Sequence, residues 1–541
     1  MYVRCQKLKG KYRRAVLICH SVRCGDKVTQ KTIKYLGVAR TEKELEALRK
    51  LAALELRKLQ SSPPDVKEIP VTWERMQEES RVIEGCHDVF GVMFDRLGFS
   101  SLFSRLRYNQ LRDITIARVA MPSSKCRTAD LLTRRYARQL SEDQIYRLMD
   151  RLIPQVDTIK SKVFEVTRHL SNQQKIDLLF FDVTTLYFES QKADELRDFG
   201  YSKNHKIGET QIVLALATTS EGLPIGYTLF SGKTAEVKTL LQCLDEWRQI
   251  ADIGDAVVIA DRAMMSADNL LAMEQKNMRY VVAAKLKQFP FKLKEQILAR
   301  HKESLVQIRT EQVLAQEYLV DKRRLIVSYS ESRALKDQED RKRLISQLQK
   351  KVPGEADPRK LVTNRGYLKF LDDKVKGKVV LNEAKIVQES RWDGLHGVIT
   401  NDMSTPKEAL LSRYRQLWII EESFRINKHT LAMRPIYHFK PQRVQAHVLI
   451  CYLAFALSRY TQHQLKSYDI CMSIEKIRDE LLQVEASIVR VQGQVYRVPS
   501  KIKAEAEAIY RALGISRAQG ATKIMDRSRC SGTKKMQLVV A

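Results

Sequence analysis

The chain lacks a long apolar run and a regular cysteine pattern. Its most apolar stretch, residues 446–457, is too short to span a bilayer and predicts a buried helix. The first ten residues are basic without an apolar core, so no signal peptide is expected. Nine cysteines, an odd number without a framework, indicate a cytoplasmic protein. Cys19, His20 and Cys24 lie close together, but no second ligand pair completes a zinc pattern.

Acidic residues are also in deficit. The 541 residues include 94 Lys plus Arg against 64 Asp plus Glu, a formal net charge of +30. Such an excess favours a polyanionic partner, and nucleic acid is the main candidate. An anionic membrane surface is the competing interpretation. The basic residues are dispersed through folded-looking segments instead of forming one amphipathic helix, which favours nucleic acid.

The length predicts several domains, since one hydrophobic core does not grow to this size. Composition and periodicity divide the chain into six parts. They are a basic β/helix unit (1–74), a helical DNA-binding region (75–170), the first part of an α/β core (171–275), a β-rich insertion (276–400), the second part of the core with a long helix (401–460), and a C-terminal region with a basic tail (461–541).

The two amino-terminal parts allow two interpretations each. Residues 14–21 and 27–36 predict strands, residues 41–60 a helix, and residues 61–65 a linker. This unit either reads DNA ends or is a solvated appendage. The following region is predicted to be helical throughout and is either a DNA-binding module or an ordinary basic bundle, since charge alone does not identify base contacts.

An acid inside an apolar segment marks the first candidate site. Residues 177–189 read as a strand covered on both faces, and Asp182 lies at its middle. A buried carboxylate is costly unless a cation or partner neutralises it. A second apolar segment, residues 256–261, delivers Asp261 at its carboxyl end, where open α/β sheets usually have their sites, and Arg262 follows.

The third acid is predicted on a helix that runs from about Pro406 to beyond Lys428. Thr405 and Glu408 predict a capping box at its start, and proline suits the first helical position. At 100° per residue, one face of this helix carries an acid among phosphate-binding types: Tyr414, Glu421, Arg425 and Lys428. Glu422 points elsewhere.

Two strand aspartates and one helix glutamate form an all-oxygen ligand set. Such a set suits paired Mg²⁺ ions better than zinc, and Mn²⁺ is expected to substitute. Two such ions can activate a water or a 3′-hydroxyl and stabilise the leaving oxygen in phosphodiester chemistry. The predicted catalytic and metal-binding residues are therefore Asp182, Asp261 and Glu421.

The order of elements supports the same site. Strands are expected at about 177–189, 211–219 and 224–231, then a helix at about 235–251 and a further strand leading to Asp261. Three antiparallel strands, a crossover helix and another strand are typical of the opening of a ribonuclease-H-like fold. The residues up to Glu421 predict an inserted, mainly β subdomain with a charged helix at 331–351 and a hairpin turn at Asp393-Gly394.

These motifs resemble the bacterial insertion-sequence transposases of the DDE type, in the branch with a Tyr, Arg, Glu, Lys signature. Tyr414, Glu421 and Lys428 match that signature, whereas Leu417 stands where the family has arginine, for which Arg425 or Arg415 is a candidate substitute. The resemblance implies a ribonuclease-H-like catalytic core interrupted by an insertion. It also implies a homodimer on double-stranded DNA that cleaves the element's inverted repeats and transfers the freed 3′-hydroxyl to target DNA.

The expected DNA contacts follow from the same resemblance and from charge. They are Tyr414, Arg425, Lys428, Arg262, Lys203, His205, Arg434, His438 and His447. Trp392 either stacks on an unpaired base or packs in the core, and His447 either binds DNA or is a buried histidine. Two other functions remain: a nuclease of this fold without strand transfer, and a DNA-binding protein that has lost catalysis.

Overall fold

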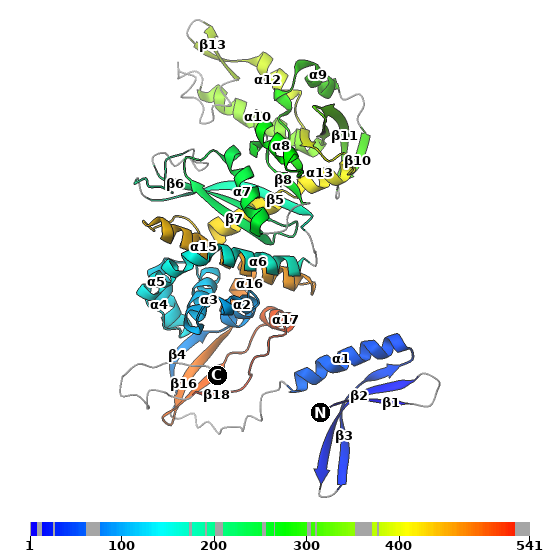
Figure 1. Ribbon diagram of the computed structural model, residues 1–541, viewed down its shortest axis with the longest axis vertical. Coiled ribbons are helices and arrows are strands. Elements are labelled where there is room, and N and C mark those ends of the chain that lie inside the picture. Colours follow the sequence, from blue (N-terminus) through cyan, green and yellow to red (C-terminus); the bar gives the residue numbers. More distant parts are fainter. Residues whose placement is uncertain are drawn as a thin grey trace. The chain divides into compact units, whose positions relative to one another are not determined.

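The computed structural model divides the chain into two compact units. The N-terminal unit comprises residues 1–78, 489–499 and 517–523, and the main unit comprises residues 79–488, 500–516 and 524–541 (Figure 1). The structure describes residues 2–7, 13–24, 27–60, 76–171, 176–189, 192–200, 209–250, 256–264, 266–299, 304–308, 311–351, 370–375 and 378–524. Within these ranges no helix is long and apolar enough to cross a membrane.

The N-terminal unit contains a three-stranded antiparallel sheet with one helix against it, as the sequence predicts. The elements are β1 (Tyr2–Lys7), β2 (Arg14–Cys24), β3 (Lys27–Ala39) and α1 (Glu42–Gln60). Val16, Ala39, Leu45 and Ala52 form its small buried core. The predicted linker at residues 61–65 lies outside the described residues. Short strands occur where the chain passes between the units: β4 (Gln77–Ile83), β16 (Glu485–Val491), β17 (Gln494–Pro499) and β18 (Thr522–Ile524).

A nine-stranded sheet organises the main unit, in the order β10-β11-β12-β15-β9-β8-β5-β6-β7. Its first half matches the predicted order of strands and helix. The elements are β5 (Leu178–Tyr187), β6 (Gln211–Thr218), β7 (Pro224–Ser231), α7 (Glu236–Ile250) and β8 (Val257–Ala260). The β5–β6 and β6–β7 pairs are antiparallel, and β8 returns parallel to β5. A crossover helix is what such a parallel connection requires.

Each strand of this half is buried on both faces, which explains its continuous apolar sequence. On β5, Phe180 and Leu186 belong to one hydrophobic cluster, while Leu179 and Phe181 belong to the other. Trp247 of α7 lies in the second cluster, so α7 covers that face. The first cluster includes most of α15 (Pro441–Lys466), which covers the opposite face (Figure 1).

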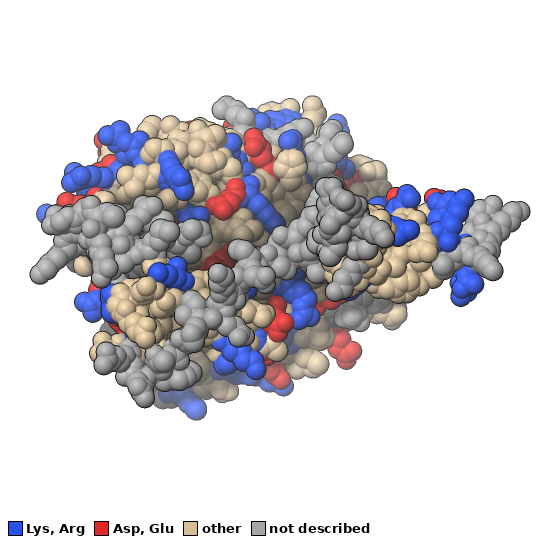
Figure 2. Space-filling view, turned by 90° about the horizontal axis from the view of Figure 1, so that it is seen from below, with Lys and Arg blue, Asp and Glu red and all other residues tan. Residues whose placement is uncertain are grey.

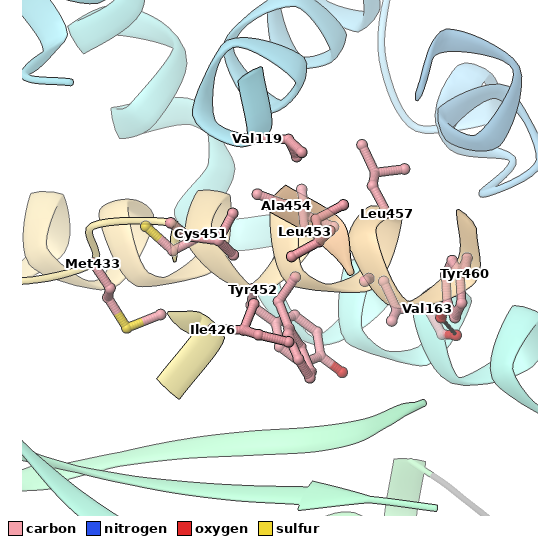
Figure 3. Packing of buried hydrophobic residues seen from close by; sticks show 14 of the residues in the cluster. Val119, Val163, Ile426, Met433, Cys451, Tyr452, Leu453, Ala454, Leu457 and Tyr460 are labelled. Atoms are coloured by element: carbon pink, nitrogen blue, oxygen red, sulfur yellow. Dashed lines mark hydrogen bonds between the residues drawn. The ribbon is translucent and has the colours of Figure 1, made fainter. Parts of the chain in front are cut away.

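Helices pack around α15, and the one that contains Thr167 also contacts the sheet, because the Thr167 hydroxyl donates to the carbonyl oxygen of Pro224 in β7. They are α2 (Gly85–Asp95), α3 (Arg105–Ala120), α4 (Lys125–Tyr136), α5 (Glu142–Leu152) and α6 (Val156–Leu170), with α16 (Ile474–Leu482) and α17 (Ala504–Leu513) from the C-terminal part. Short 3₁₀ turns lie between them, η2 (Phe99–Ser101) and η3 (Ile153–Gln155). The predicted buried helix at 446–457 is confirmed, since every residue in that range is buried. Figure 3 shows Leu453 and Leu457 directed toward the helices and Tyr452 toward the sheet.

Most strands of the insertion, which the sequence predicts to be mainly β, belong to the central sheet. Its strands β9 (Arg279–Ala283), β10 (Ser304–Ile308), β11 (Glu311–Val320), β12 (Arg323–Tyr329) and β15 (Leu395–Thr400) extend the central sheet. Only β13 (Leu371–Val375) and β14 (Lys378–Leu381) pair separately within the described part of the insertion. Its helices are α9 (Phe291–Ala299), α10 (Glu331–Lys351) and α12 (Glu383–Ser390), and α10 confirms the charged helix predicted at 331–351. Helix α8 (Ala267–Gln275) precedes the insertion.

A lysine, Lys125, is buried in the helical part, where it contacts a histidine. The ammonium of Lys125 lies 3.1 Å from Nδ1 of His447, whose Nε2 lies 3.0 Å from the carbonyl oxygen of Met433. Burial, together with the nearby charge of Arg118, lowers the pKa of Lys125 to about 7. Burial likewise holds the pKa of His447 well below its usual value. Neutral His447 therefore donates from Nε2 to Met433 and accepts from Lys125 at Nδ1.

We expect Leu453→Ala to lower the free energy of unfolding by about 2–5 kcal/mol, because a fully buried leucine leaves a cavity when it is truncated. Chemical denaturation followed by tryptophan fluorescence measures the change. Leu319→Ala is the matched control, since the Leu319 side chain is 72% exposed, and it should change stability by less than about 0.5 kcal/mol. Equal effects of the two substitutions would contradict the proposed core.

Lys125→Met should show a pH-dependent difference from the wild type. The folded protein holds the pKa of Lys125 near 7, well below the usual value for a lysine in an unfolded chain, so the unfolded chain binds more protons above pH 7. Wild-type stability should therefore rise relative to the variant as pH increases from about 7 to 10, by up to about 1.4 kcal/mol per pH unit. Denaturation at several pH values tests this, with exposed Lys476→Met as a control that shows no such trend.

Candidate active site

Asp182 lies within β5 and faces the cluster that contains α15. Residues of a strand alternate between the two faces of a sheet. Phe180 and Leu186 on β5 both belong to the α15 cluster, so Asp182 and Thr184 between them share that face. The Asp182 side chain is half-buried, and its carboxylate accepts a hydrogen bond from the backbone N–H of Val183 at 2.7 Å.

The register of β5 with β8 brings the second aspartate beside the first. The last paired residues of these parallel strands are Phe181 and Ala260. The next positions are Asp182 and Asp261, on strands that are about 4.8 Å apart. Asp261 is exposed at the carboxyl end of β8 and precedes the short 3₁₀ turn η4 (Arg262–Met264).

The predicted continuous helix from Pro406 to Lys428 is wrong. The structure has α13 (Lys407–Arg415), a turn at residues 416–417, α14 (Trp418–Arg425) and a π-helical turn, η8 (Ile426–Thr430). The predicted capping box is also wrong, because Pro406 is the N-cap and has no side-chain cap. The hydroxyl of Thr405 instead donates to Asp402, whose carboxylate also accepts from the backbone N–H groups of Ser404 and Thr405.

Two consecutive glutamates on α14 have different surroundings. Glu421 is exposed and lines a pocket with Asp261. Glu422 forms an ion pair of 2.8 Å with Arg459 of α15, and the Arg459 guanidinium also donates to the Ser423 hydroxyl at 3.3 Å. Because Ile420 is buried on the same helix, this ion pair and the apolar contact together leave Glu421 facing the pocket.

The pocket has a volume of about 1390 Å³ and lies where the core and the insertion meet. Its wall combines the end of β8, the residues after β9 with η5 (Leu286–Gln288), helix α10, the turn before β15, and α13 with α14. The charged lining residues are Asp261, Arg262, Lys285, Lys287, Arg333, Lys336, Asp337, Asp340, Arg341, Glu389, Asp393, Arg415 and Glu421. Seven cations and six anions therefore line it, which suits a phosphate ligand held beside acids.

Tyr414 and His396 form an aromatic pair in the wall of this pocket, with ring centroids 5.0 Å apart. Burial raises the pKa of the Tyr414 hydroxyl, and the negative charges of Asp261 and Glu421 contribute to the increase. Both acids are therefore close enough to Tyr414 to interact with its hydroxyl electrostatically. Burial lowers the pKa of His396 to about 3, helped by the charge of Arg333, so its imidazole is neutral near pH 7. The sequence analysis missed His396 and Arg333, because their proximity depends on strand pairing far along the chain.

The donor set fits a hard divalent cation in chemistry, with carboxylate oxygens from two adjacent strands and one helix. In the described part of the chain, no three Asp, Glu, His or Cys side chains are grouped closely enough to hold one ion together. Asp182 is not among the residues that line the pocket with Asp261 and Glu421. The three acids can therefore bind an ion together only if their side chains move. Asp261 and Glu421 are exposed and have room to do so.

The predicted phosphate-binding residues divide into those at the pocket and those away from it. Tyr414 and Arg262 line the pocket. Lys428 lies in η8 and donates a hydrogen bond to the hydroxyl of Thr184, two residues from Asp182. Arg425 does not line the pocket and forms an ion pair of 3.4 Å with Glu422. The break between α13 and α14 and the π turn account for this difference from the predicted common face.

The family's arginine is replaced by Leu417, and the structure distinguishes the two candidate substitutes. Leu417 is buried and touches the pocket with an apolar side chain. Arg415 lines the pocket, two residues before Leu417, whereas Arg425 does not. Arg415 is therefore the one placed to contact a ligand there.

The remaining predicted contacts have separate positions. Arg434 lies over the ring of Tyr187, with its guanidinium carbon 5.4 Å from the ring centroid. His438 is half-buried against His447, with ring centroids 5.3 Å apart, and burial lowers its pKa to about 3. Of the two alternatives for His447, the structure favours the buried histidine. Lys203 and His205 lie outside the described residues.

The turn at Asp393-Gly394 joins α12 to β15 and is not a hairpin, which corrects that prediction. Gly394 has φ +78°, a conformation that favours glycine. Arg341 of α10 forms an ion pair with Asp393 through both carboxylate oxygens. Trp392 beside this turn is half-buried, packs against the α7 cluster and lines the pocket, with the ammonium of Lys287 5.9 Å from its ring centroid.

The positive charge is spread over the surface. In Figure 2, Lys and Arg side chains are scattered across the drawn face, with Asp and Glu among them. A single basic stripe is not visible on that face. The pocket lining likewise mixes both signs of charge, and it includes the candidate acids Asp261 and Glu421.

Comparisons with known proteins identify the family of the chain. Residues 173–457 match the family described as Transposase DDE domain, and residues 3–65 match the one described as IS1634 family transposase, N-terminal domain. No curated protein matches the chain. A solved structure of a piggyBac transposase synaptic complex with hairpin DNA is similar at a TM-score of 0.36 and 10% identity, over 74% of this chain and 77% of that chain, which is too weak to carry an argument. Because the first match covers more than half of the sequence, the chain belongs to the insertion-sequence transposases with a DDE domain.

Proposed function

We propose that this transposase cleaves DNA at the ends of its element and joins the freed 3′-hydroxyl to target DNA, with Asp182, Asp261 and Glu421 as its catalytic acids. The observation that carries the proposal is the β5–β8 register, which makes Asp182 and Asp261 neighbours on adjacent strands. Glu421 lines one pocket with Asp261, and the charges of both acids raise the pKa of the Tyr414 hydroxyl. The chemistry needs three carboxylates around one region of the sheet, and these three residues are far apart only in the sequence.

The proposed core is ribonuclease-H-like. Three antiparallel strands, a crossover helix and a fourth strand parallel to the first support this assignment. The acid-bearing helix α14 packs its buried residues into the cluster on the face of the sheet that carries Asp182. In this arrangement the insertion strands continue the same sheet beyond β9.

The three acids would hold two Mg²⁺ ions, for which Mn²⁺ can substitute, since all ligands are carboxylate oxygens. When bound, such ions lower the pKa of an attacking water or hydroxyl and stabilise charge on the leaving oxygen. Asp182 and Asp261 would bind on the strand side and Glu421 on the helix side. No side-chain general base is then required.

Residues around the acids would position the phosphates. Tyr414 and Arg262 border the pocket with Asp261, and Arg415 supplies a guanidinium where the family's arginine is replaced by Leu417. A planar guanidinium can bind two phosphate oxygens at once. Lys428, fixed at Thr184, would contact a phosphate on the other side of Asp182.

More distant contacts and assembly are also part of the proposal. Trp392 would stack on an unpaired base that enters the pocket, because its ring lines the pocket and has the ammonium of Lys287 5.9 Å from its centroid. Two copies of the chain would assemble on a pair of double-stranded element ends. The N-terminal unit, with its small basic sheet, would read those ends.

Glu421→Gln should reduce Mg²⁺-dependent nicking of element-end DNA by more than about a thousand-fold, because loss of a metal ligand removes several kcal/mol of transition-state stabilisation. Binding of the same DNA should change by less than about two-fold, since one pocket carboxylate contributes little to a phosphate-dominated interface. Gel assays with duplexes taken from the DNA that flanks the coding region measure both.

Exposed Glu505→Gln on α17 is the matched control and should leave nicking unchanged. Nicking by the Glu421 variant at the wild-type rate would refute the assignment. The same gels distinguish a transposase from a nuclease, because only strand transfer yields products joined to target DNA.

Binding of element-end duplex should weaken steeply with salt. A chain with a net charge of +30 that neutralises several phosphates releases counterions on binding, and each phosphate contact lowers the slope of log K against log salt by about 0.9. Fluorescence anisotropy from about 50 to 200 mM salt measures this slope. A flat response would contradict a phosphate-dominated interface.

A further inference from the structure

The segment between η8 and α15, residues 434–440, carries two exposed aromatic rings that the proposed chemistry does not use. The segment is attached beside β5, because Ile436 forms a parallel β-bridge with Phe188, just after the end of β5. The N–H of Ile436 donates to the carbonyl oxygen of Tyr187. The segment therefore follows the same strand that carries Asp182, further along it.

Side chains of this segment alternate between the interior and the surface. Ile436 is 2% exposed, and His438 is half-buried, edge-on to Tyr146 with ring centroids 6.0 Å apart. Tyr437 is 61% exposed and Phe439 is 71% exposed. The inward pair anchors the segment, and the outward pair presents two rings to solvent. Two aromatic side chains at such exposure, two residues apart, serve no packing role that the structure shows.

A cation lies near one of these rings, Phe439, and two more belong to the segment itself. The guanidinium carbon of Arg197 lies 5.5 Å from the ring centroid of Phe188 and 6.0 Å from that of Phe439. Arg197 is 5% exposed and paired with Asp194 at 2.6 Å, and one of its terminal nitrogens, Nη1, is buried without a hydrogen-bond partner. Arg434 also has a buried Nη1 without a partner, and Lys440 is exposed at the other end of the segment.

We propose that Tyr437 and Phe439 form a stacking platform for unpaired nucleotides of single-stranded DNA. Residues two apart in an extended chain are separated by roughly 6.6 Å, about twice the 3.4 Å rise of stacked bases, so one base fits between the two rings. Aromatic rings with adjacent cations are the usual combination for single strands, because every base has a π face and every nucleotide a phosphate. Arg434 and Lys440 supply the cations at the two ends of the platform.

This inference rests on the proposed function, since cleavage and strand transfer create unpaired DNA near the acids. It goes further by naming where such a strand binds. A protein partner is a poorer fit, because a stable interface buries about 800 Å² on each side and two rings expose far less. The charges agree with DNA, since the nearby carboxylates of Asp150 and Asp194 are already paired with Arg443 and Arg197.

The test is binding of a fluorescein-labelled oligothymidylate of about 12 nucleotides, compared with a duplex of the same length, by anisotropy. Tyr437→Ala and Phe439→Ala should each weaken single-strand binding about ten-fold, and the double variant by more, whereas duplex binding should change by less than about two-fold. Phe439→Tyr should retain wild-type affinity, because it keeps the ring. Phe291→Ala is the matched control, since Phe291 is 74% exposed on α9, and it should bind both probes as the wild type does.

Equal losses for single strand and duplex, or no loss in either, would overturn the platform. So would a change from dimer to monomer in the double variant by analytical ultracentrifugation without a loss of single-strand binding, which would assign the rings to a contact between copies. Glu421→Gln separates the two proposals. It should abolish nicking and leave oligothymidylate binding intact, so an inactive wild type with ring-dependent binding would remove the proposed function alone.

Discussion

The parallel pairing of β5 with β8 is the constraint on which the site depends. Only four residues of each strand pair, Leu178–Phe181 with Val257–Ala260. Their register nevertheless decides whether Asp182 and Asp261 are neighbours. A slip by one residue would turn every side chain of one strand to the other face and bury an aspartate against α7. The apolar residues on both faces oppose such a slip, because Phe180 and Phe181 belong to different clusters and neither can exchange without exposing or crowding a ring.

The acid helix is held by a second constraint, in which adjacent glutamates have opposite roles. Glu422 is fixed by Arg459 of the long buried helix, and this contact orients the helix on which Glu421 stands. Removing one member of a partly buried pair leaves the other charge without compensation. The two glutamates are adjacent in the sequence and have the same local context. Their different surroundings therefore depend on contacts with α15 and not on α14 alone.

Much of the fold was predictable because its signals are local. The strands β5 to β8 and helix α7 appear in the sequence as apolar runs bounded by turns, and their order already indicated the parallel return to β5. The two candidate aspartates were predicted from the same runs, and Glu421 from the face of a predicted helix. Helix α10 was predicted at its observed bounds because charged residues at helical spacing fill it.

The errors arose where a non-local contact outweighed a local signal. Thr405 has the sequence of a helix cap, but Asp402 binds its hydroxyl and ends the preceding strand region in a tight turn. No proline or glycine at residues 416–417 predicts the break between α13 and α14, and Leu417 is buried there. No local signal indicates that β15 pairs with β9 and β12, so neither the continuation of the central sheet into the insertion nor the position of His396 was predicted.

The continuous sheet has a consequence for how the main unit comes apart. Strands β12 and β15 of the insertion are hydrogen-bonded through β9 to β8, so no strand edge separates insertion from core in the described part of the sheet. Unfolding the insertion alone would leave the backbone groups of β8 that pair with β9 without hydrogen-bond partners, which is costly in a buried strand. Insertion and core therefore share one cooperative transition, and a protease that cuts between them would release no independently stable fragment.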